Sequence, residues 1–573
     1  MLTIAIIGCG LSGTSLFCQL VERFHCHSAS GKLDPDSIRV IVFEKGSLMG
    51  PGMPHNAEFV QPYHITNMCA EHMSIFHDRP GDFQTWMVQN RDELESRYPA
   101  LCAELIGFTG LRTTCNHYPR ALMGAYLSHR FNSYVERGRE LGMQIDPLAN
   151  AEVSDIQEKR NHVSILVGNL ANGSAQEFPV DRAVIATGHW LNKTRGAGYF
   201  PSPWPADRLL QNIPTGSRVA IIGTSLSAIE TALTLTADGH FVHEADQTLA
   251  YQHPQHPRKP ALFSRNGLLP SVRGRIGTYR NRVLTPQKLT DLRNQKTAQF
   301  NLDTLFELFN AELLQAYGQP FDWRTHLDTR IPPAERLARS IATARHGDGP
   351  EGDVIWQTVL HQLLPFVRDL YLGLSIGERK RFEKQFKTPF FVFAAPQPII
   401  NAQKLLALIK ADSVHIHRLA KTHRWPQGDH TRAYTVDYID GLGKQRRESY
   451  PYVVDARGQQ VSWRDNPSIL ARNLLRTGVV QTTEIRVERD DAGDGGDGTG
   501  SPETYNVGSV CINPETHAVI QVDPYGNFHP SHRIFALGAM TRGQIIDTSM
   551  AQSLAESANR IVSQVLIAIR DYS

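Results

Sequence analysis

The chain has 573 residues, with 59 basic and 57 acidic side chains and a formal net charge of +2. This near balance predicts no basic surface for nucleic acid, and no apolar run of about 18 residues is present to cross a membrane, so neither is an expected partner. Because a single core stops growing at about 250–300 residues, we expect several domains. The seven cysteines are scattered without a CxxC, which excludes the usual redox dithiol and favours a reducing, cytoplasmic location.

A glycine-rich turn follows the first expected strand. Residues 2–7 form a short apolar run, and Gly8, Gly10 and Gly13 then give a GxGxxG motif that also contains Ser12. The first glycine permits a tight turn, the second lets pyrophosphate approach the backbone, and the third lets the next helix pack on the strand. The pattern predicts a dinucleotide site, which we assign to FAD.

A second apolar strand, residues 38–43, ends in Glu44, whose carboxylate is expected to bind the ribose hydroxyls, with Lys45 in the same site. Glu44 lies 31 residues after Gly13 (44 − 13), against about 20 in the usual pattern, and a polar insert accounts for the excess. Later strand ends add Thr187 and Gly188, then Gly538, then Gly543 and Thr548 at the start of a helix expected to run to residue 566.

A second nucleotide motif follows the strand at residues 218–222. It reads Gly223-x-Ser225-x-Ser227-Ala228, a GxSxxA in place of GxGxxG, and alanine at the third position is compatible with dinucleotide binding. We expect a neighbouring strand to end at Ser264 and Arg265. A guanidinium there can bind a 2′-phosphate, which favours NADPH. Glu244 and Asp246 keep NADH open. The histidine-rich insert from 240 to 258 lacks zinc spacing, so no metal is expected.

Several further stretches resemble a known bacterial group. They are Tyr63–Met68, Met73–Phe76, Asp82-Phe83 with Trp86, Pro119–Leu127, Ala186–Trp190 and Ser264–Pro270. Together they are similar to bacterial FAD/NAD(P)-binding flavin monooxygenases, a group that includes urate hydroxylase-like proteins and is related to enzymes that N-oxygenate aspartate to nitrosuccinate. The resemblance implies that Asn67, Met68 and Arg120 lie near the flavin, with Asn67 and Arg120 as candidate catalytic residues.

The expected fold class is α/β, with two Rossmann-like, three-layer dinucleotide-binding domains and an added helical region. We expect an FAD-binding part at 1–205, an NAD(P)H-binding domain at 206–283, a helical insertion at 284–400 and a return to the FAD-binding domain at 401–573. Apolar residues recur at three and four through the insertion. It lies beside four arginines that are candidates to bind an acidic substrate, namely Arg275, Arg280, Arg330 and Arg339.

Two dinucleotide sites in one chain predict an NADPH-dependent FAD monooxygenase. Reduced flavin would form a C4a-(hydro)peroxide with O2 and oxygenate a small polar molecule, with the nitrogen of an aspartate-like amino acid or amine as the preferred target. Urate-like ring hydroxylation is the alternative, followed by flavin reduction without oxygenation or nucleotide sensing. The expected partners are therefore the small substrate and O2, and a homo-oligomer is left open.

Overall fold

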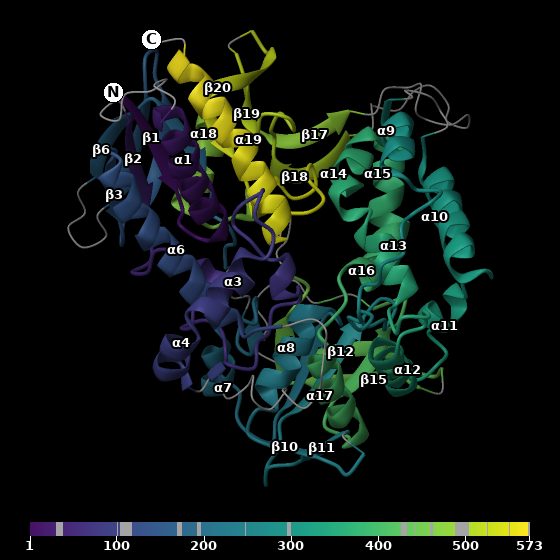
Figure 1. The fold of residues 1–573 in the computed structure, drawn as a ribbon. Helices are drawn as coiled ribbons and strands as arrows, with labels where there is room; N and C mark the ends of the chain where they lie inside the picture. The colour runs from purple at the N-terminus through teal and green to yellow at the C-terminus, as the bar shows by residue number, and fades with distance from the viewer. Residues whose placement is uncertain are drawn as a thin grey trace, which may run out of the picture.

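The computed structural model describes residues 1–29, 38–99, 101–102, 117–168, 175–191, 196–246, 248–294, 300–423, 425, 433–441, 443–458, 462–486, 504–523, 525–548 and 550–570. Figure 1 shows three parts: a sheet with its helices at the upper left, a second sheet below, and a helical region at the right. Each nucleotide motif of the sequence lies in a different sheet.

The first sheet is built on the N-terminal strand. Its order is β19-β20-β7-β1-β2-β3, and all neighbours are parallel except the β19–β20 pair. The strands are β1 (Leu2–Ile7), β2 (Ile38–Phe43), β3 (Gln144–Leu148), β7 (Arg182–Ile185), β19 (Ala518–Val522) and β20 (Phe528–Ala536). The strand order reverses at β1, so the crevice outside its carboxyl end is the place where such sheets bind ligands.

Three layers form because β1 is apolar on both faces. Ile4 and Ile6 pack against helices, whereas Ala5 and Ile7 pack against a small antiparallel sheet. The helices are α1 (Leu11–Ala29), α6 (Arg120–Glu140) and α19 (Ala551–Arg570), and the opposite layer holds β4 (Glu152–Glu158), β5 (Val163–Gly168), β6 (Ala175–Val180) and α18 (Ile469–Thr477). The expected three-layer arrangement is confirmed for this domain, although α19 begins at Ala551 rather than at Thr548.

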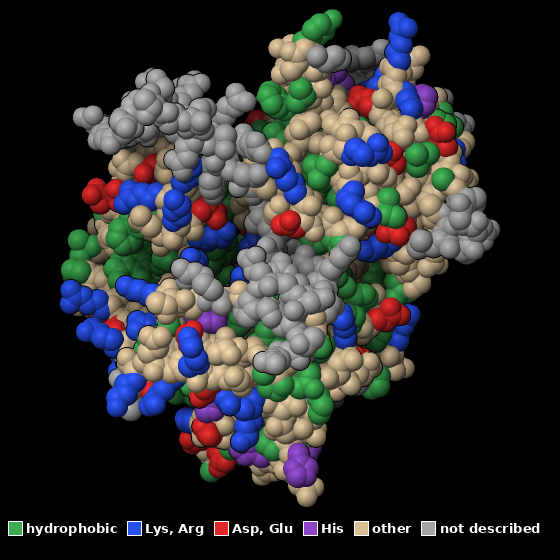
Figure 2. Space-filling model, turned by 180° about the vertical axis from the view of Figure 1, so that it is seen from behind, with side chains coloured by type: hydrophobic (Ala, Val, Ile, Leu, Met, Phe, Trp, Pro, Cys, Tyr) green, Lys and Arg blue, Asp and Glu red, His purple; other side chains and the backbone are tan. Residues whose placement is uncertain are grey.

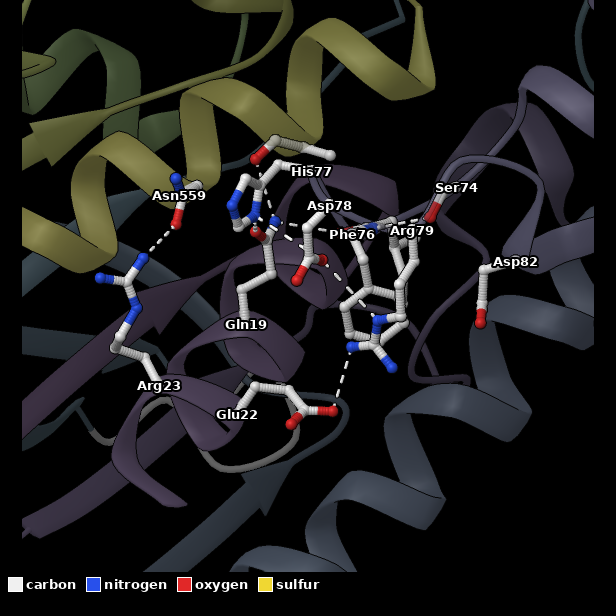
Figure 3. Close-up of polar contacts among 12 residues, drawn as sticks. Gln19, Glu22, Arg23, Ser74, Phe76, His77, Asp78, Arg79, Asp82 and Asn559 are labelled. Atoms are coloured by element: carbon white, nitrogen blue, oxygen red, sulfur yellow. Dashed lines mark hydrogen bonds and ion pairs between the residues drawn. The ribbon is translucent and has the colours of Figure 1, made fainter. Parts of the chain in front are cut away.

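Side-chain hydrogen bonds join the last helix, α19, to the first helix, α1. The Gln19 side chain on α1 donates to Ala555 O of α19 over 2.9 Å and to Ile75 O over 3.0 Å, and it accepts from His77 (Figure 3). Arg23 reaches Asn559 on α19 over 2.8 Å. Residues almost at the two ends of the chain therefore share one helical layer. Residues 75–77, which follow the expected flavin neighbours Asn67 and Met68, contact this layer through Gln19.

The second sheet has the order β15-β14-β13-β12-β9-β16-β8. Its strands are β8 (Tyr199–Phe200), β9 (Arg218–Ile222), β12 (Lys259–Ser264), β13 (His415–Leu419), β14 (Tyr434–Ile439), β15 (Gln445–Tyr450) and β16 (Tyr452–Asp455). Helices α7 (Ala206–Asn212), α8 (Leu226–Leu235) and α17 (Ile399–Lys410) cover one face, and the hairpin β10 (His240–His243) with β11 (Leu249–Gln252) lies outside the sheet. The order reverses at β9, which gives this sheet its own ligand-binding edge.

The expected return to the first domain at residue 401 is corrected by this sheet. Helix α17 and strands β13 to β16 belong to the second domain, and among the later strands that the structure describes, β19 and β20 rejoin the first sheet. Val453 and Val454 of β16 are buried on both faces, as the residues of β7 are. A short apolar strand that precedes a glycine is compatible with either sheet, so the local sequence pattern does not show which of the two sheets the strand joins.

The segment from 284 to 400 is helical, as its periodicity predicted. It contains α9 (Pro286–Asn294), α10 (Leu302–Tyr317), α11 (Trp323–Leu327), α12 (Pro333–His346), α13 (Ile355–His361), α14 (Leu364–Gly373), α15 (Ile376–Arg381), the π-helical turn η3 (Phe382–Phe386) and α16 (Lys387–Ala394). Glu312 on α10 is fully buried and accepts from the Tyr279 hydroxyl over 2.6 Å and from the Val283 and Leu284 amides over 2.7 Å. This carboxylate fixes the chain where it enters the helical region.

Shorter elements and a second hairpin complete the fold. Near the first sheet lie α2 (Gly52–His55), η2 (Ala70–His72), α3 (Asp82–Gln89), α4 (Arg91–Arg97), η4 (Trp463–Asp465), β17 (Thr482–Arg486), β18 (Thr504–Val510) and η6 (Ala539–Thr541). Within the described ranges, no helix is long and apolar enough to span a membrane.

Candidate functional site

The first glycine turn lies at the carboxyl end of β1 and cannot carry side chains. The Gly8 amide donates to Phe43 O over 2.8 Å, and its φ of +100° is one that side chains rarely adopt. A Cβ on Gly8 would lie 2.5 Å from Ala186 O, and a Cβ on Gly13 would overlap Gly8 O. The turn therefore places the amino end of α1 at the edge of the sheet, and only backbone atoms line this position. Such a backbone-lined helix start fits a pyrophosphate.

Glu44 is tied to this turn through both of its carboxylate oxygens. Oε2 accepts from the Cys9 amide over 2.9 Å, and Oε1 accepts from the Gly46 amide over 2.8 Å. Because Cys9 belongs to the glycine turn, the carboxylate is held beside any nucleotide bound there, and each oxygen keeps a second acceptor position for a ribose hydroxyl. Lys45, the next residue, is exposed to solvent.

The C-terminal strand brings a further glycine to the same edge. A Cβ on Gly538 would lie 2.8 Å from Ser12 Oγ, and Gly538 has a φ of +86°. A Cβ on Gly10 would lie 3.3 Å from the Cα of Gly52, so the turn is also packed closely from its other side. Residues 526 positions apart (538 − 12) thus enclose one site, whose bare backbone walls fit FAD.

The other expected residues of this site lie at the ends of β7 and β20. Thr187 Cα is 3.0 Å from the Cβ position that Gly8 leaves empty, and Gly188 has a φ of +66° with open space where a side chain would project. Gly543 has a φ of +104°, and its carbonyl accepts from the Tyr371 hydroxyl of the helical region over 3.3 Å. Thr548 is buried shortly before α19.

Asn67 and Met68 lie close to the start of α6 because two segments pair there. Ile65 forms an isolated antiparallel bridge with Pro119, and the Arg120 amide donates to His64 O over 2.7 Å. The two stretches that carry the family resemblance therefore meet in the structure. Asn67 and Met68 are both half-buried beyond this bridge.

The Arg120 side chain points to the second domain. Its Nε donates to Glu230 Oε1 on α8 over 2.9 Å, and the Glu230 side chain is 4% exposed. Burial raises the pKa of Glu230, which the adjacent guanidinium partly offsets. Burial, with the positive charge of Arg120 as the second cause, lowers the pKa of both His55 and His64 to about 3, so both imidazoles are neutral. Arg120 and Glu230 are the oppositely charged side-chain types of this group, and they form an ion pair.

The second glycine turn repeats the design of the first at the end of β9. The Gly223 amide donates to Phe263 O over 2.7 Å, and Gly223 has a φ of +118° that favours glycine. Ser225 is exposed at the N-cap of α8, and Ser227 is half-buried in the first turn of that helix. A hydroxymethyl group at Ser225 therefore points to solvent rather than into the sheet, so the GxSxxA variant leaves the helix start accessible.

The neighbouring strand ends as the sequence predicted. The Ser264 hydroxyl accepts from Thr224 Oγ1 over 3.0 Å and from the Gly267 amide over 2.9 Å, which shapes the turn, and Arg265 is exposed beside it. Sequence reasoning missed Arg418, which is also exposed and stands opposite Ser264 on β13. Two guanidinium-bearing residues at one sheet edge fit a phosphate-bearing nucleotide.

The four arginines expected to bind an acidic substrate do not converge. Arg330 and Arg339 are exposed and form ion pairs within their own segments, and Arg275 and Arg280 are exposed. Figure 2 shows Lys and Arg side chains around a hollow between the upper and lower parts of the face seen from behind. A fifth arginine, Arg273, lies inward, and its side chain contacts Met68. No periodicity or motif marked it, because it stands in an irregular segment.

One cysteine differs from expectation. Cys69 is disulfide-bonded, whereas the free thiols include Cys9, Cys18, Cys26, Cys102 and Cys511. The cysteines therefore no longer argue for a reducing compartment.

Comparisons with known proteins agree with this geometry. Residues 5–190 match the family model described as FAD-NAD(P)-binding. An uncharacterised protein of Escherichia coli K12, YdhS, is 23% identical over 488 residues, which are 80% of this chain and 84% of that protein. The reduced form of ornithine hydroxylase (PvdA) from Pseudomonas aeruginosa superposes with a TM-score of 0.50 at 12% identity, covering 99% of this chain and 100% of that one.

The family match contains the first glycine turn, Glu44, Asn67 and Arg120, and the structural match extends the likeness of fold over both sheets and the helical region. Residues 5–190 therefore match an FAD-NAD(P)-binding segment, and the chain as a whole has a fold like that of the ornithine hydroxylase.

Proposed function

We propose that this protein is an NADPH-dependent FAD monooxygenase that oxygenates a small polar substrate, preferably the nitrogen of an aspartate-like amino acid or amine. The observation that carries the proposal is the presence of two side-chain-free glycine turns, at Gly8 and Gly223, each at the carboxyl end of the strand where its sheet reverses order. One turn suits FAD and the other suits the reduced nicotinamide nucleotide.

The residues of the first site bind and orient. The start of α1 holds the pyrophosphate, Glu44 holds the ribose, and Gly538 lets Ser12 approach without a side chain between them. Bound FAD supplies the chemistry, namely acceptance of a hydride from NADPH and activation of O2. Asn67 and Met68 follow a strand-like bridge that fixes their backbone, and we assign Asn67 to orienting the substrate or the flavin ring.

The residues of the second site select and position NADPH. Ser264 and Arg265 bind the 2′-phosphate, and α8 presents its amino end, with Ser225 and Ser227, to the pyrophosphate. Arg120 acts between the two sites. Its ion pair with Glu230 sets the distance between α6 and α8, so in addition to a role near the flavin it positions the nicotinamide domain.

Oxygenation of nitrogen is favoured by the likeness of fold to an ornithine hydroxylase over the whole length of both chains. Disulfide reduction is disfavoured because the sequence has no CxxC. Urate-like ring hydroxylation, flavin reduction without oxygenation and nucleotide sensing remain as distinguishable outcomes of one experiment.

The purified FAD-loaded protein would be mixed anaerobically with NADPH or NADH, and the flavin absorbance would be followed. We expect faster bleaching with NADPH. The reduced protein would then receive 18O2 with aspartate, ornithine, lysine or urate, and the products would be analysed by mass spectrometry. One labelled oxygen on an amino nitrogen supports the proposal, and a label on the urate ring selects the alternative. Reduction without a labelled product indicates a reductase, and no reduction by either nucleotide indicates a sensing protein.

A further inference from the structure

Arg273 is held firmly by its backbone. Its amide donates to Gln397 O over 2.8 Å. On either side, the Gln357 side chain on α13 accepts from the Gly274 amide over 3.1 Å and donates to Val272 O over 2.7 Å. A Cβ on Gly274 would overlap the Val354 side chain, so the segment lies directly against α13. These contacts use only the main chain of Arg273 and leave its side chain free to serve another purpose.

The guanidinium of Arg273 has no carboxylate partner among the described residues. Its Nη2 lies 3.6 Å from Met68 Sδ, a weak acceptor, and its Nε is buried without a hydrogen-bond partner. Desolvation lowers the pKa of Arg273 to about 10, which still leaves the side chain charged at neutral pH. A buried cation without an anion is costly and is usually paired, so the arrangement calls for an external anion.

Three histidines surround this cation and add no negative charge. His72 and His361 have ring centroids 4.7 Å apart, and His117 donates from Nδ1 to Thr66 O over 2.8 Å. Burial lowers the pKa of His117 and of His361 to about 4, and the charge of Arg273 contributes to both shifts. The carboxylate of Glu71 lies 3.5 Å from His72 and is half-exposed. The local charge at Arg273 is thus positive at neutral pH.

We propose that Arg273 is the anchor for a carboxylate group of the substrate, which makes the substrate class carboxylate-bearing amines rather than simple amines. The planar guanidinium can donate two parallel hydrogen bonds to two carboxylate oxygens, a match that a lysine does not offer. The assignment of the bound carboxylate to a substrate rests on the proposed function. The inference that Arg273 binds an anion does not depend on that function.

The location of Arg273 suits such a role. It joins three parts of the fold: Met68 and His72 come from the first domain, Arg273 follows strand β12 of the second, and His361 ends α13 of the helical region. A carboxylate bound to Arg273 would lie beside the segment Asn67-Met68. The amino nitrogen of the same molecule would then be a few bonds away, within reach of the flavin assigned to that segment.

The anion site is tested first without catalysis. Thermal unfolding of the FAD-loaded protein would be followed after addition of aspartate, succinate, lysine or ornithine. Each compound would be added at roughly 10–50 mM, a concentration suited to weak ligands. The variants are Arg273→Met, Arg273→Lys and the exposed control Arg275→Met. We expect at least one carboxylate to raise Tm in the wild type and in R275M, to do so less in R273K, and to have no effect in R273M. An equal rise in Tm in the wild type and in R273M would contradict the proposal that Arg273 binds the carboxylate.

Stability without ligand separates a binding role from a structural one. Since the half-buried Arg273 side chain has no carboxylate partner among the described residues, R273M should unfold at the same temperature as the wild type or higher. A lower Tm with normal ligand response would show that the side chain supports the fold and would overturn the proposal. The FAD content of R273M should equal that of the wild type, and a slowed anaerobic reduction by NADPH with unaltered ligand response would instead place Arg273 on the flavin.

Turnover then tests the substrate class. Wild-type activity would be compared within pairs that differ by the carboxylate: lysine with cadaverine, ornithine with putrescine, and aspartate with its diamide. We expect the acid of a pair to be preferred, and KM for it to rise about 10- to 100-fold in R273M. Preference for the amines would overturn the anchor. If carboxylates stabilise the protein through Arg273 but no oxygenated product forms, the anchor stands and the proposed monooxygenase function fails.

Discussion

Arg120 Nε lies 2.9 Å from Glu230 Oε1 and joins helix α6 of the first domain to helix α8 of the second. Both side chains are largely withdrawn from solvent, at 17% and 4% exposure. Glu230 Oε2 has no hydrogen-bond partner, so the carboxylate depends on Arg120 for its compensation. The pair therefore couples the relative position of the two nucleotide sites to one charged contact.

Removing one member of this ion pair should lower the free energy of unfolding more than removing both members. Arg120→Met leaves a buried carboxylate uncompensated, and we expect a loss of about 3–5 kcal/mol in the free energy of unfolding. The double variant R120M/E230M, which removes the charge as well, should lose clearly less. Urea unfolding of the three proteins measures both values. A double variant as unstable as R120M would show that the pair has no such dependence.

The third glycine of the first turn should be indispensable. A Cβ on Gly13 would overlap Gly8 O, a main-chain atom that cannot move without opening the turn. We expect Gly13→Ala to lose bound FAD or to fail to fold, as measured by flavin absorbance per purified chain. The matched control is Gly441→Ala, where a Cβ meets nothing within 4 Å. Normal FAD content in G13A would contradict the assignment of this turn.

Arg265 should decide between the two nicotinamide nucleotides. Its side chain is exposed at the end of β12, where a 2′-phosphate would lie. Arg265→Ala should raise KM for NADPH by about 10- to 100-fold, because a charge-assisted contact is lost, and leave KM for NADH nearly unchanged. Stopped-flow reduction with each nucleotide measures the ratio. A parallel rise for both nucleotides would mean that Arg265 does not contact the 2′-phosphate.

His64 should make the protein less stable in acid. Its Nδ1 accepts from the Gln61 amide over 3.1 Å and its Nε2 donates to Thr234 Oγ1 over 2.9 Å, so it is neutral with the proton on Nε2. Burial lowers its pKa from 6.5 to about 3. Between these values the unfolded chain binds the proton and the folded chain does not, so stability is complete above pH 6.5 and falls as pH decreases toward 3.

From this residue alone we expect a loss of about 2–3 kcal/mol between pH 6.5 and pH 4.5. His64→Gln removes the titrating group, so its free energy of unfolding should change less over the same interval. Urea unfolding at both pH values provides the comparison, and the other buried histidines contribute equally to the two proteins. Identical pH dependence would contradict the neutral assignment.

Much of the first site could be predicted because its residues are consecutive or end a strand. The bounds of β1 and β2, the glycine turn and the acid at Glu44 follow from apolar runs and fixed spacing, and the strand ending at Ser264 was found in the same way. These features are local, so a single sequence contains all the information they need.

The remainder depends on which distant partner a segment chooses. The strand Tyr452–Asp455 has a pattern that suits either sheet, and its pairing with β9 is decided by the packing of the whole second domain. Arg273 could not be identified because its significance lies in the three-dimensional arrangement, where none of the described residues places a carboxylate against its guanidinium. Arg120 was selected by resemblance, and its bond to Glu230 on another domain has no signature in sequence.

The contact of Gly538 with Ser12 also sets an order of events during synthesis. At a ribosomal rate of about 5–20 residues per second, roughly 18–70 s separate the synthesis of Ile185 from that of Gly538, 353 residues later (538 − 185). During that interval the strand Arg182–Ile185 lacks its neighbour β20, and its unpaired edge is open to other chains. The nascent protein therefore needs protection of that edge until nearly its whole length has been made, and the flavin site can close only at the end of translation.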